Sequence, residues 1–206
     1  MEYIAPIYKS AADAKNFPVA AIDSYVWDEN GFRPESYGAV FAVENEGIHA
    51  VLWSFEENVR CECKRRDDAV YTDSCLEFFI MPFENDERYL NFEVNPNGVY
   101  LSQIGACRND RVFIKELTKT EPAVYPIKIE EGGKLAWGYE LIIPEKLISE
   151  LYKTDYSVSE TEMRANFYKC GDMTDRPHYG SHFPVRTDSP DFHRPEFFGT
   201  IIFRKA

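Results

Sequence analysis

Residues 74–104 read SCLEFFIMPFENDERYLNFEVNPNGVYLSQI and carry the clearest structural signal in the chain. Large apolar residues alternate with polar ones on both sides of a loop at 82–88, which is typical of half-buried β-strands. The loop is centred near residue 85, so a symmetric antiparallel hairpin pairs the flanking strands about that point. The predicted partners are Phe78 with Phe92, Ile80 with Leu90, and Leu76 with Val94.

A second turn follows at Asn95-Pro96-Asn97-Gly98, with proline at its second and glycine at its fourth position. A four-residue turn there sets Val94 beside Val99 and Phe92 beside Leu101. Burial of the apolar face is worth on the order of 1.5–3 kcal/mol per large side chain, which fixes the register against a one-residue slip. The residues expected on this core face are Leu76, Phe78, Ile80, Leu90, Phe92, Val94, Val99 and Leu101.

The opposite face of the three strands then takes the alternate residues. These are Glu77, Asn91, Glu93, Tyr100 and Ser102. Glu77 and Glu93 lie directly across from each other in this register, with Cβ atoms roughly 4.5–5.5 Å apart. Two carboxylates so placed repel unless water, a cation, an arginine or the hydroxyls of a ligand stabilise them. Two interpretations stay open, a solvated outer face or a polar binding surface in a concave sheet.

Short alternating or apolar segments recur along the rest of the chain. They lie at 37–44, 47–55, 122–130, 134–143, 162–170 and 197–203. This spacing predicts an all-β fold, an antiparallel β-sandwich of the jelly-roll or immunoglobulin-like kind, as one domain over residues 1–206. One short helix is expected near 144–152, with Pro144 at its start. Among the tryptophans, Trp53 and Trp137 are expected in the core and Trp27 at the surface.

Composition excludes several classes of protein. The chain has 206 residues and a formal net charge of −12, which argues against nucleic acid or an anionic membrane as the main partner. It is 44% hydrophobic and 15% aromatic, so disorder is excluded as the dominant state. No run of 18 apolar residues suggests a membrane span. The many flat aromatic rings suit strands, and they also suit sugar rings. The oligomeric state is not predicted.

The cysteines and the N-terminus bear on the compartment. Five cysteines at irregular spacing do not form a disulfide framework, and structural thiols in a reducing compartment fit best. Residues 1–17 show no basic region followed by an apolar stretch and a cleavage site. We therefore expect a cytoplasmic protein if the sequence is complete, and an extracellular or periplasmic one if a signal has been removed.

Four stretches together resemble a known family. Asp73-Ser-Cys-Leu-Glu77-Phe-Phe-Ile80 and Tyr89-Leu-Asn-Phe-Glu-Val-Asn-Pro-Asn-Gly98 look like the central strands of family 9 carbohydrate-binding modules. Arg164-Ala-Asn-Phe-Tyr-Lys-Cys-Gly171 and Phe192-His-Arg-Pro-Glu-Phe-Phe-Gly199 are similar to its stand-alone bacterial branch, within the DOMON-like β-sandwiches. The resemblance covers residues 35–205 and implies a β-sandwich that binds a sugar without acting on it.

The resemblance also implies positions for a sugar site. Tyr71 stands where the family has a stacking tryptophan, and Glu77 stands on its sugar-binding acid. Glu93 stands where an arginine is expected, which reverses the charge there. His182 stands where a late loop carries an aromatic ring. The expected site is Tyr71 as stacking platform, Glu77, Glu93, Asn91 and Tyr100 on the polar face, and Arg164 and His182 at the rim.

Other chemistry remains open beside sugar binding. Glu77 and Glu93 could serve as the acid and the base or nucleophile of a glycoside hydrolase, although an enzyme is the less favoured interpretation. A protein-interaction domain with no small ligand is a third alternative. The resemblance implies structural calcium as a possible cofactor. Its ligands could come from Arg65-Arg-Asp-Asp68 with Asp73, for which a solvated loop is the alternative.

Overall fold

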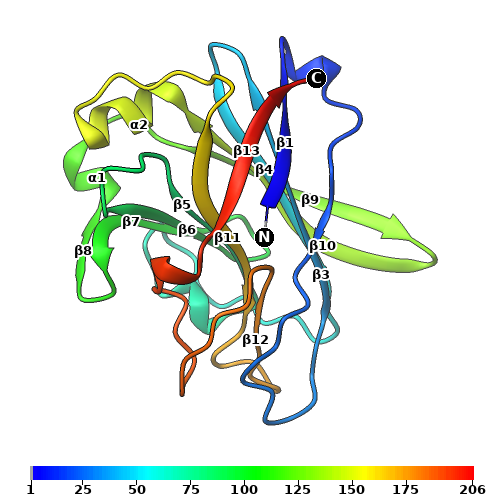
Figure 1. Cartoon of the computed structure of the whole chain (residues 1–206). Coiled ribbons are helices and arrows are strands. Elements are labelled where there is room, and N and C mark those ends of the chain that lie inside the picture. Colours follow the sequence, from blue (N-terminus) through cyan, green and yellow to red (C-terminus); the bar gives the residue numbers. More distant parts are fainter. Residues whose placement is uncertain (1) are drawn as a thin grey trace.

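Strands are the main secondary structure of the protein and its helices are short, as the computed structural model of residues 2–206 shows (Figure 1). The strands are β1 (Glu2–Tyr8), β2 (Ala20–Ala21), β3 (Glu35–Val43), β4 (Gly47–Phe55), β5 (Cys75–Met81), β6 (Tyr89–Val94), β7 (Tyr100–Cys107), β8 (Asp110–Phe113), β9 (Ala123–Glu131), β10 (Lys134–Pro144), β11 (Glu162–Cys170), β12 (Tyr179–Ser181) and β13 (Gly199–Lys205). The helices are α1 (Ile114–Leu117) and α2 (Glu145–Tyr152), and the 3-10 turns are η1 (Ala11–Asp13), η2 (Val70–Thr72) and η3 (Pro195–Phe197).

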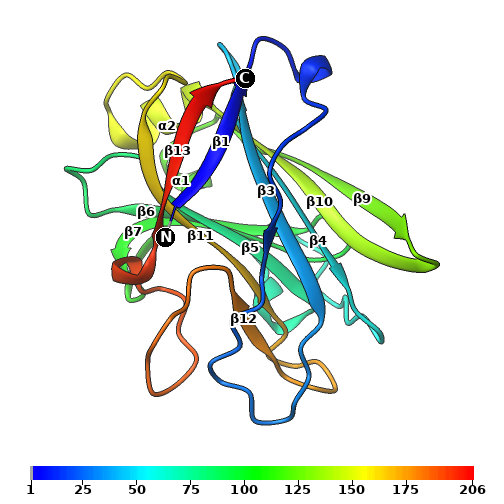
Figure 2. The same ribbon diagram turned by 45° about the vertical axis from the view of Figure 1, so that its right-hand side comes forward.

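The described strands form one hydrogen-bonded sheet that curls into two layers. Their order is β8-β7-β6-β5-β11-β13-β1-β3-β4-β10-β9, with β12 beside β11 and β2 beside β3. One layer contains β5 to β8 and β11, and the other contains β3, β4, β9 and β10. The strands β13 and β1 carry the sheet from one layer to the other (Figure 2). The predicted all-β sandwich is confirmed.

The seam between the layers, formed by β1 and β13, corrects the prediction of a purely antiparallel sheet. β1 runs parallel to β13, with Glu2 opposite Thr200. It also runs parallel to β3, with Ile7 opposite Ala42. The sheet is therefore mixed. Strands joined by local turns pair antiparallel, and the prediction rests on such turns. The seam instead pairs β1 with β13, which lie far apart in the sequence, so no local turn sets their direction.

The core between the layers confirms the predicted register of the β5–β6 hairpin. Leu76 pairs with Val94, Glu77 with Glu93, Phe78 with Phe92, and Ile80 with Leu90. Phe78 stacks on Phe167 of β11 with ring centroids 5.0 Å apart. The Tyr139 hydroxyl of the other layer donates to the Leu76 carbonyl at 3.2 Å. The apolar alternation of 76–94 thus faces the core, as expected.

The register of β7 differs by one residue from the prediction. Val94 pairs with Tyr100 and Glu93 with Leu101, because the turn has three loop residues and not four. Asn95 pairs with Val99, its side chain accepts from the backbone N–H of Asn97 and Val99, and Gly98 has φ +75°. A glycine at positive φ after a tight turn is typical of three-residue hairpin loops.

The slip reverses both faces of β7 relative to the prediction. Tyr100 packs against the core between the layers, and Ser102 is fully buried opposite Phe92. Leu101 and Gln103 take the outer face, beside the two glutamates. The predicted positions of Val99, Tyr100, Leu101 and Ser102 are therefore wrong, although the strand itself is where we expected it.

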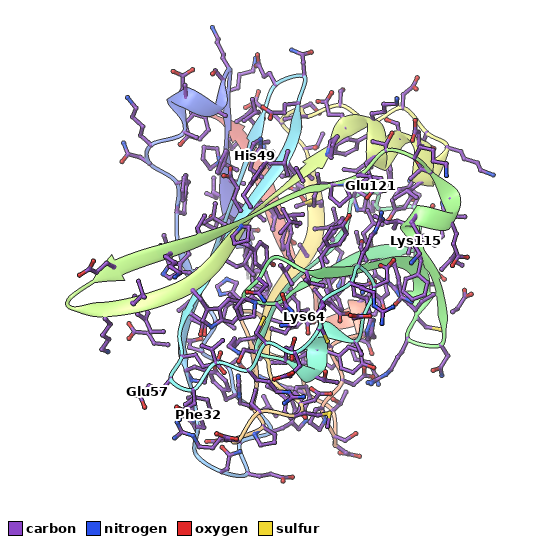
Figure 3. All side chains as sticks on the ribbon, turned by 180° about the vertical axis from the view of Figure 1, so that it is seen from behind. Phe32, His49, Glu57, Lys64, Lys115 and Glu121 are labelled. Carbon is purple, nitrogen blue, oxygen red and sulfur yellow. The ribbon has the colours of Figure 1, made fainter. Side chains whose placement is uncertain are left out.

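The remaining sequence-based expectations are partly met. The helix near 144–152 is α2, which buries Leu147, Ile148 and Leu151 and follows Pro144. Trp137 is in the core, whereas Trp53 lies half-buried on the outer face of β4, stacked on Tyr37. The β9–β10 hairpin extends out of the sandwich (Figure 3). Within residues 2–206, no helix is long and apolar enough to cross a membrane.

Candidate functional site

The outer face of β5, β6 and β11 is covered over part of its area by the loop at 183–198. This loop and the strands form a second apolar cluster that includes Phe79, Tyr89, Tyr168, Phe192 and Phe198. The rings of Tyr168 and Phe192 stack with centroids 4.2 Å apart. Beside this cluster the outer face is left open, and a cavity lies there.

The cavity has a volume of about 200 Å³, smaller than the roughly 300–1,000 Å³ of pockets for drug-sized ligands. A space of this size suits one small polar ring better than a long chain. Its lining comes from η2, β5, β6, β7, β11, β12 and the loops after β7, β11 and β12. The lining residues are Tyr71, Glu77, Glu93, Leu101, Gln103, Arg108, Cys170, Asp172, Tyr179, Pro190, Asp191, Phe192 and His193.

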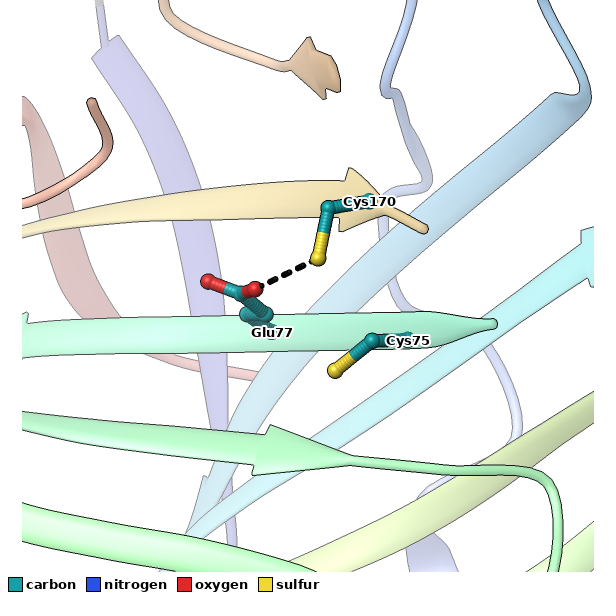
Figure 4. A group of neighbouring side chains, drawn as sticks. All are labelled: Cys75, Glu77 and Cys170. Atoms are coloured by element: carbon teal, nitrogen blue, oxygen red, sulfur yellow. Dashed lines mark hydrogen bonds between the residues drawn. The ribbon is translucent and has the colours of Figure 1, made fainter. Parts of the chain in front are cut away.

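Glu77 lies beside the thiols of Cys75 and Cys170 (Figure 4) and lines the floor of the cavity. Its Oε1 is 2.9 Å from the Sγ of Cys170, which donates to it. Cys75, two residues earlier on β5, pairs with Cys170 across the strands. Burial, followed by the nearby charge of Glu93, raises the pKa of Glu77 well above its ordinary value. Burial also raises the pKa of Cys75 to about 12. The environment at the floor of the cavity therefore favours the protonated, neutral forms of Glu77 and Cys75.

Glu93 lies opposite Glu77 and is held by one amide. The Asn91 Nδ2 donates to Glu93 Oε1 at 2.9 Å. Arg111 in turn donates to the side-chain oxygen of Asn91 and lies over the Tyr89 ring, 4.1 Å from its centroid. The second carboxyl oxygen of Glu93 is buried and has no hydrogen-bond partner. Burial raises the pKa of Glu93 to about 7.

Two further carboxyl groups lie at the mouth of the cavity. Asp172 interacts with the hydroxyl of Tyr179, and burial raises the pKa of Asp172 above its ordinary value. Asp191 Oδ1 lies 3.1 Å from Arg108 Nη1. His193 meets the Tyr89 hydroxyl at 2.9 Å through Nδ1, and burial lowers the pKa of His193 to about 3. The imidazole is therefore neutral at physiological pH.

Aromatic rings line the cavity. Tyr71, on η2, is 41% exposed and is the most accessible of them. Phe192 is held from behind by Tyr168, and Tyr179 and Trp27 contact each other edge to face. The indole N–H of Trp27 donates to the Thr187 carbonyl at 2.7 Å, so this tryptophan anchors the loop and is half-buried. The prediction that Trp27 lies exposed at the surface is therefore wrong.

The structure brings together three of the predicted site residues, Tyr71, Glu77 and Glu93, on one cavity. Both glutamates are only 3% exposed, which excludes a solvated outer face. Asn91 lies directly behind Glu93, fully buried, and orients its carboxyl group. The Glu77–Glu93 juxtaposition inferred from the strand register is therefore real.

The other three predicted residues lie elsewhere. The Tyr100 hydroxyl donates to Glu121 at 2.8 Å, on the core side of β7. Arg164 donates to three backbone carbonyls of residues 195–198 and so fixes η3. His182 Nδ1 contacts the Ala21 carbonyl at 2.8 Å, which ties β12 to the N-terminal segment. Their observed contacts are structural.

Sequence reasoning missed the residues of the mouth, which are Gln103, Arg108, Asp172, Tyr179, Asp191 and His193. Gln103 was missed because of the slip in β7. The others lie in or beside loops without periodicity, so no pattern indicated that they converge. In the sequence, only Asp172 and Asp191 directly flank motifs of the family resemblance, and His193 lies within one of them.

The predicted calcium ligands are engaged with donors of the protein. Asp73 accepts from the backbone of Glu62 and Cys63 and from Asn95 Nδ2. Asp68 accepts from two backbone N–H groups, and Asp67 lies 2.6 Å from Lys115 Nζ. These carboxylates hold the surrounding loops in place through bonds to protein donors, so they do not fit a calcium site. Across residues 2–206, only Cys75, Glu77 and Cys170 form a group of three potential ligands whose ligand atoms all lie within 4.8 Å of one another.

The chain is similar to a known protein family and to several solved structures. The model of carbohydrate-binding family 9 matches residues 7–203. A proposed carbohydrate-binding protein from Bacteroides uniformis is similar over 98% of this chain and 99% of its own, with 26% identity and a TM-score of 0.80. No curated protein matches the chain.

Two further solved structures share the fold. A family 9 module from Caldicellulosiruptor kristjanssonii in complex with glucose is 10% identical, with a TM-score of 0.61 over 100% of this chain and 97% of its own. A family 9 module from the same organism in complex with cellotriose is also 10% identical, with a TM-score of 0.60 over 100% of this chain and 95% of its own.

Proposed function

The chain belongs to carbohydrate-binding family 9, and we propose that it binds a sugar, without turnover, in the cavity lined by Tyr71, Glu77 and Glu93. The observation that supports this most is the pairing of Glu77 with Glu93 on the floor of a cavity lined by aromatic rings. Sugar rings present apolar C–H faces and polar edges, so they need both kinds of surface at once.

The roles of the residues follow from their chemistry. The exposed ring of Tyr71 offers a face on which a sugar can stack. The carboxyl oxygens of Glu77 and Glu93 accept hydrogen bonds from sugar hydroxyls, and such bonds are stronger when the acceptor is ionised. Gln103, at the same cavity, offers both an amide donor and an acceptor. The volume of about 200 Å³ favours a monosaccharide or the end of a chain.

Titration calorimetry with a panel of monosaccharides and short oligosaccharides tests the proposal. We expect saturable binding of at least one sugar, and Tyr71→Ala should weaken it about 2- to 10-fold, the equivalent of roughly 0.5–1.5 kcal/mol for an aromatic contact. Tyr125→Ala is the matched control, because Tyr125 is 54% exposed on β9, away from the cavity. Equal losses in both variants would contradict the assignment.

The same protein preparation separates binding from hydrolysis. Glu77 and Glu93 are two carboxyl groups with raised pKa values, and such a pair also suits an acid and a base. Release of nitrophenol from aryl glycosides by the wild type, lost in Glu77→Gln, would replace the binding function by catalysis. We expect no release above the buffer blank.

A further inference from the structure

The cavity has more carboxyl groups than cationic groups. Four acids line it, Glu77, Glu93, Asp172 and Asp191, against one guanidinium group, that of Arg108. Arg108 is paired with Asp191 at 3.1 Å, so these two charges offset each other. Three acids are then left facing one small space.

None of these three acids has a cationic partner among the described residues, 2–206. Glu77 accepts from the thiol of Cys170, Glu93 accepts from the amide of Asn91, and Asp172 interacts with a phenol. No lysine, arginine or histidine nitrogen in this part of the chain lies within ion-pair distance of them. Their carboxyl groups therefore depend on neutral donors alone.

The nearest buried cations are engaged elsewhere. The Nζ of Lys169 lies 3.1 Å from Glu56 and 2.7 Å from His178, on the core side of β11. Arg111 donates only to carbonyl and amide oxygens, those of Tyr89, Asn91, Gln103 and Gly105. Their charges therefore act on the two glutamates only through space, Arg111 lowering the pKa of Glu93 and Lys169 that of Glu77 against the larger rise from burial, and neither side chain forms an ion pair with them.

The free oxygen of Glu93 makes this a built site and not only a cluster of acids. Glu93 is 3% exposed, its Oε1 is held by Asn91, and its Oε2 is buried without a partner while the residue lines the cavity. A buried acceptor left unpaired costs free energy, so it marks a position where a donor of the ligand belongs.

We propose that the preferred ligand is a sugar with a free ammonium group, an amino sugar, whose nitrogen binds between Glu77, Glu93 and Asp172. This inference rests on the proposed sugar-binding function and names its ligand class. An ammonium group has three N–H donors and no acceptor, which matches three carboxyl groups and a free oxygen. A bound cation favours the ionised forms of the neighbouring acids, and its bonds to the resulting carboxylates are charge-assisted. Tyr71, Tyr179 and Phe192 line the same cavity, and the face of an aromatic ring attracts a cation.

A metal ion fits this set of groups less well. The metal-ligand group consists of Cys75, Glu77 and Cys170, and it includes neither Glu93 nor Asp172. A metal held there would leave the free oxygen of Glu93 unpaired. Aromatic rings also do not ligate metal ions, whereas they do stabilise ammonium groups next to a sugar ring.

The test is calorimetric titration of the full chain with three sugars of one configuration, glucosamine, glucose and N-acetylglucosamine, repeated in the galacto and manno series. We expect the free amine to bind at least tenfold more tightly than both the parent sugar and the acetylated form, which has no charge. Glu93→Gln and Asp172→Asn should each reduce this ratio severalfold. Glu130→Gln is the matched control, since Glu130 is exposed on β9, and it should leave the ratio unchanged.

The outcomes separate the two proposals. Equal affinity for the amine and its parent sugar would overturn the ammonium inference and leave sugar binding intact. No binding of any sugar would overturn the proposed function as well. Tight binding of Zn²⁺ or Ca²⁺ alone, with loss of amine binding in its presence, would overturn the inference in favour of a metal site. Thermal unfolding and circular dichroism of each variant identify any that fails to fold, and the ratio measured on the wild type does not depend on them.

Discussion

Two groups of buried carboxyls, one on each side of β11, are built differently. Glu56, on the core side, accepts from Ser74 Oγ at 2.9 Å, Trp137 Nε1 at 3.1 Å and Lys169 Nζ at 3.1 Å. Glu93, on the cavity side, has the amide of Asn91 as its partner and keeps one oxygen free. Both carboxyl groups are almost completely shielded from water.

The difference between them separates structure from function. A buried charge that is paired and hydrogen-bonded on every side holds the fold together, and it has nothing left to offer a ligand. A buried acid that lacks donors destabilises the empty protein and is stabilised when a ligand supplies them. The contacts of the Glu56 group are therefore those of a structural pair, whereas the free oxygen of Glu93 supports the proposal that its group binds the ligand.

The largest effect is expected where the paired group is broken. Lys169→Met removes the ammonium partner of Glu56 and should lower the free energy of unfolding by about 3–5 kcal/mol, because an uncompensated buried charge remains. Urea unfolding at constant pH measures the change. The double variant Glu56→Gln/Lys169→Met should recover much of the loss, and a double variant no more stable than the single one would contradict the assigned role of the pair.

The contribution of Glu93 to stability should change with pH in the opposite sense from that of a paired carboxylate. The pKa of Glu93 is raised to about 7 in the folded protein, against an ordinary value of 4.5. The folded state then binds the proton more tightly, so this contribution to stability is complete below pH 4.5 and is lost as the pH rises through about 7.

Glu93→Gln, which stays neutral, removes this contribution together with the effect of the Glu93 charge on Glu77. The stability of the wild type relative to the variant should fall by on the order of 1–3 kcal/mol between pH 4.5 and pH 8. Burial lowers the pKa values of His178 and His193 to about 3, so the protein loses stability as the pH falls below 6.5. This loss is equal in the wild type and the variant and cancels in the difference between them. Chemical unfolding at a series of pH values measures the difference, and a constant difference would show that Glu93 is ionised throughout.

The smallest effect is expected for the ion pair at the mouth of the cavity. Arg108 is 60% exposed and pairs with Asp191. Arg108→Gln should change the free energy of unfolding by less than about 1 kcal/mol, since exposed ion pairs contribute little. A loss as large as that of Lys169→Met would mean that the charges around the cavity also support the fold, and it would remove the distinction between the two groups.

Much of the layer that carries the site could be predicted from the sequence. The β5–β6 hairpin has one register because a slip of one residue would expose Leu76, Phe78 and Ile80 together. That register alone places Glu77 opposite Glu93. The next hairpin was mispredicted because its register depends on whether Asn95 pairs with Val99, which a side-chain hydrogen bond and one glycine at positive φ decide.

The walls of the cavity could not be predicted in the same way. Asp172, Asp191 and His193 are set by loops whose paths depend on tertiary contacts, such as the bond from Trp27 to the Thr187 carbonyl. No periodicity in the sequence reports such contacts. Likewise, Arg164 lies on the expected face of β11, but its guanidinium group donates to three backbone carbonyls of residues 195–198 and not into the cavity.

The seam formed by β1 and β13 has a consequence for the growing chain. Glu2 pairs with Thr200, so the strand that joins the two layers finds this partner only after about 200 residues have been synthesised. Pairings this distant in sequence form late and slow folding, because the chain entropy is lost before the contact is gained. Until then β3 and β11 present unpaired edges, which are templates for association with other chains. The sandwich therefore closes only after β13 has formed, and until then the edges of these two strands are open to pairing with other chains.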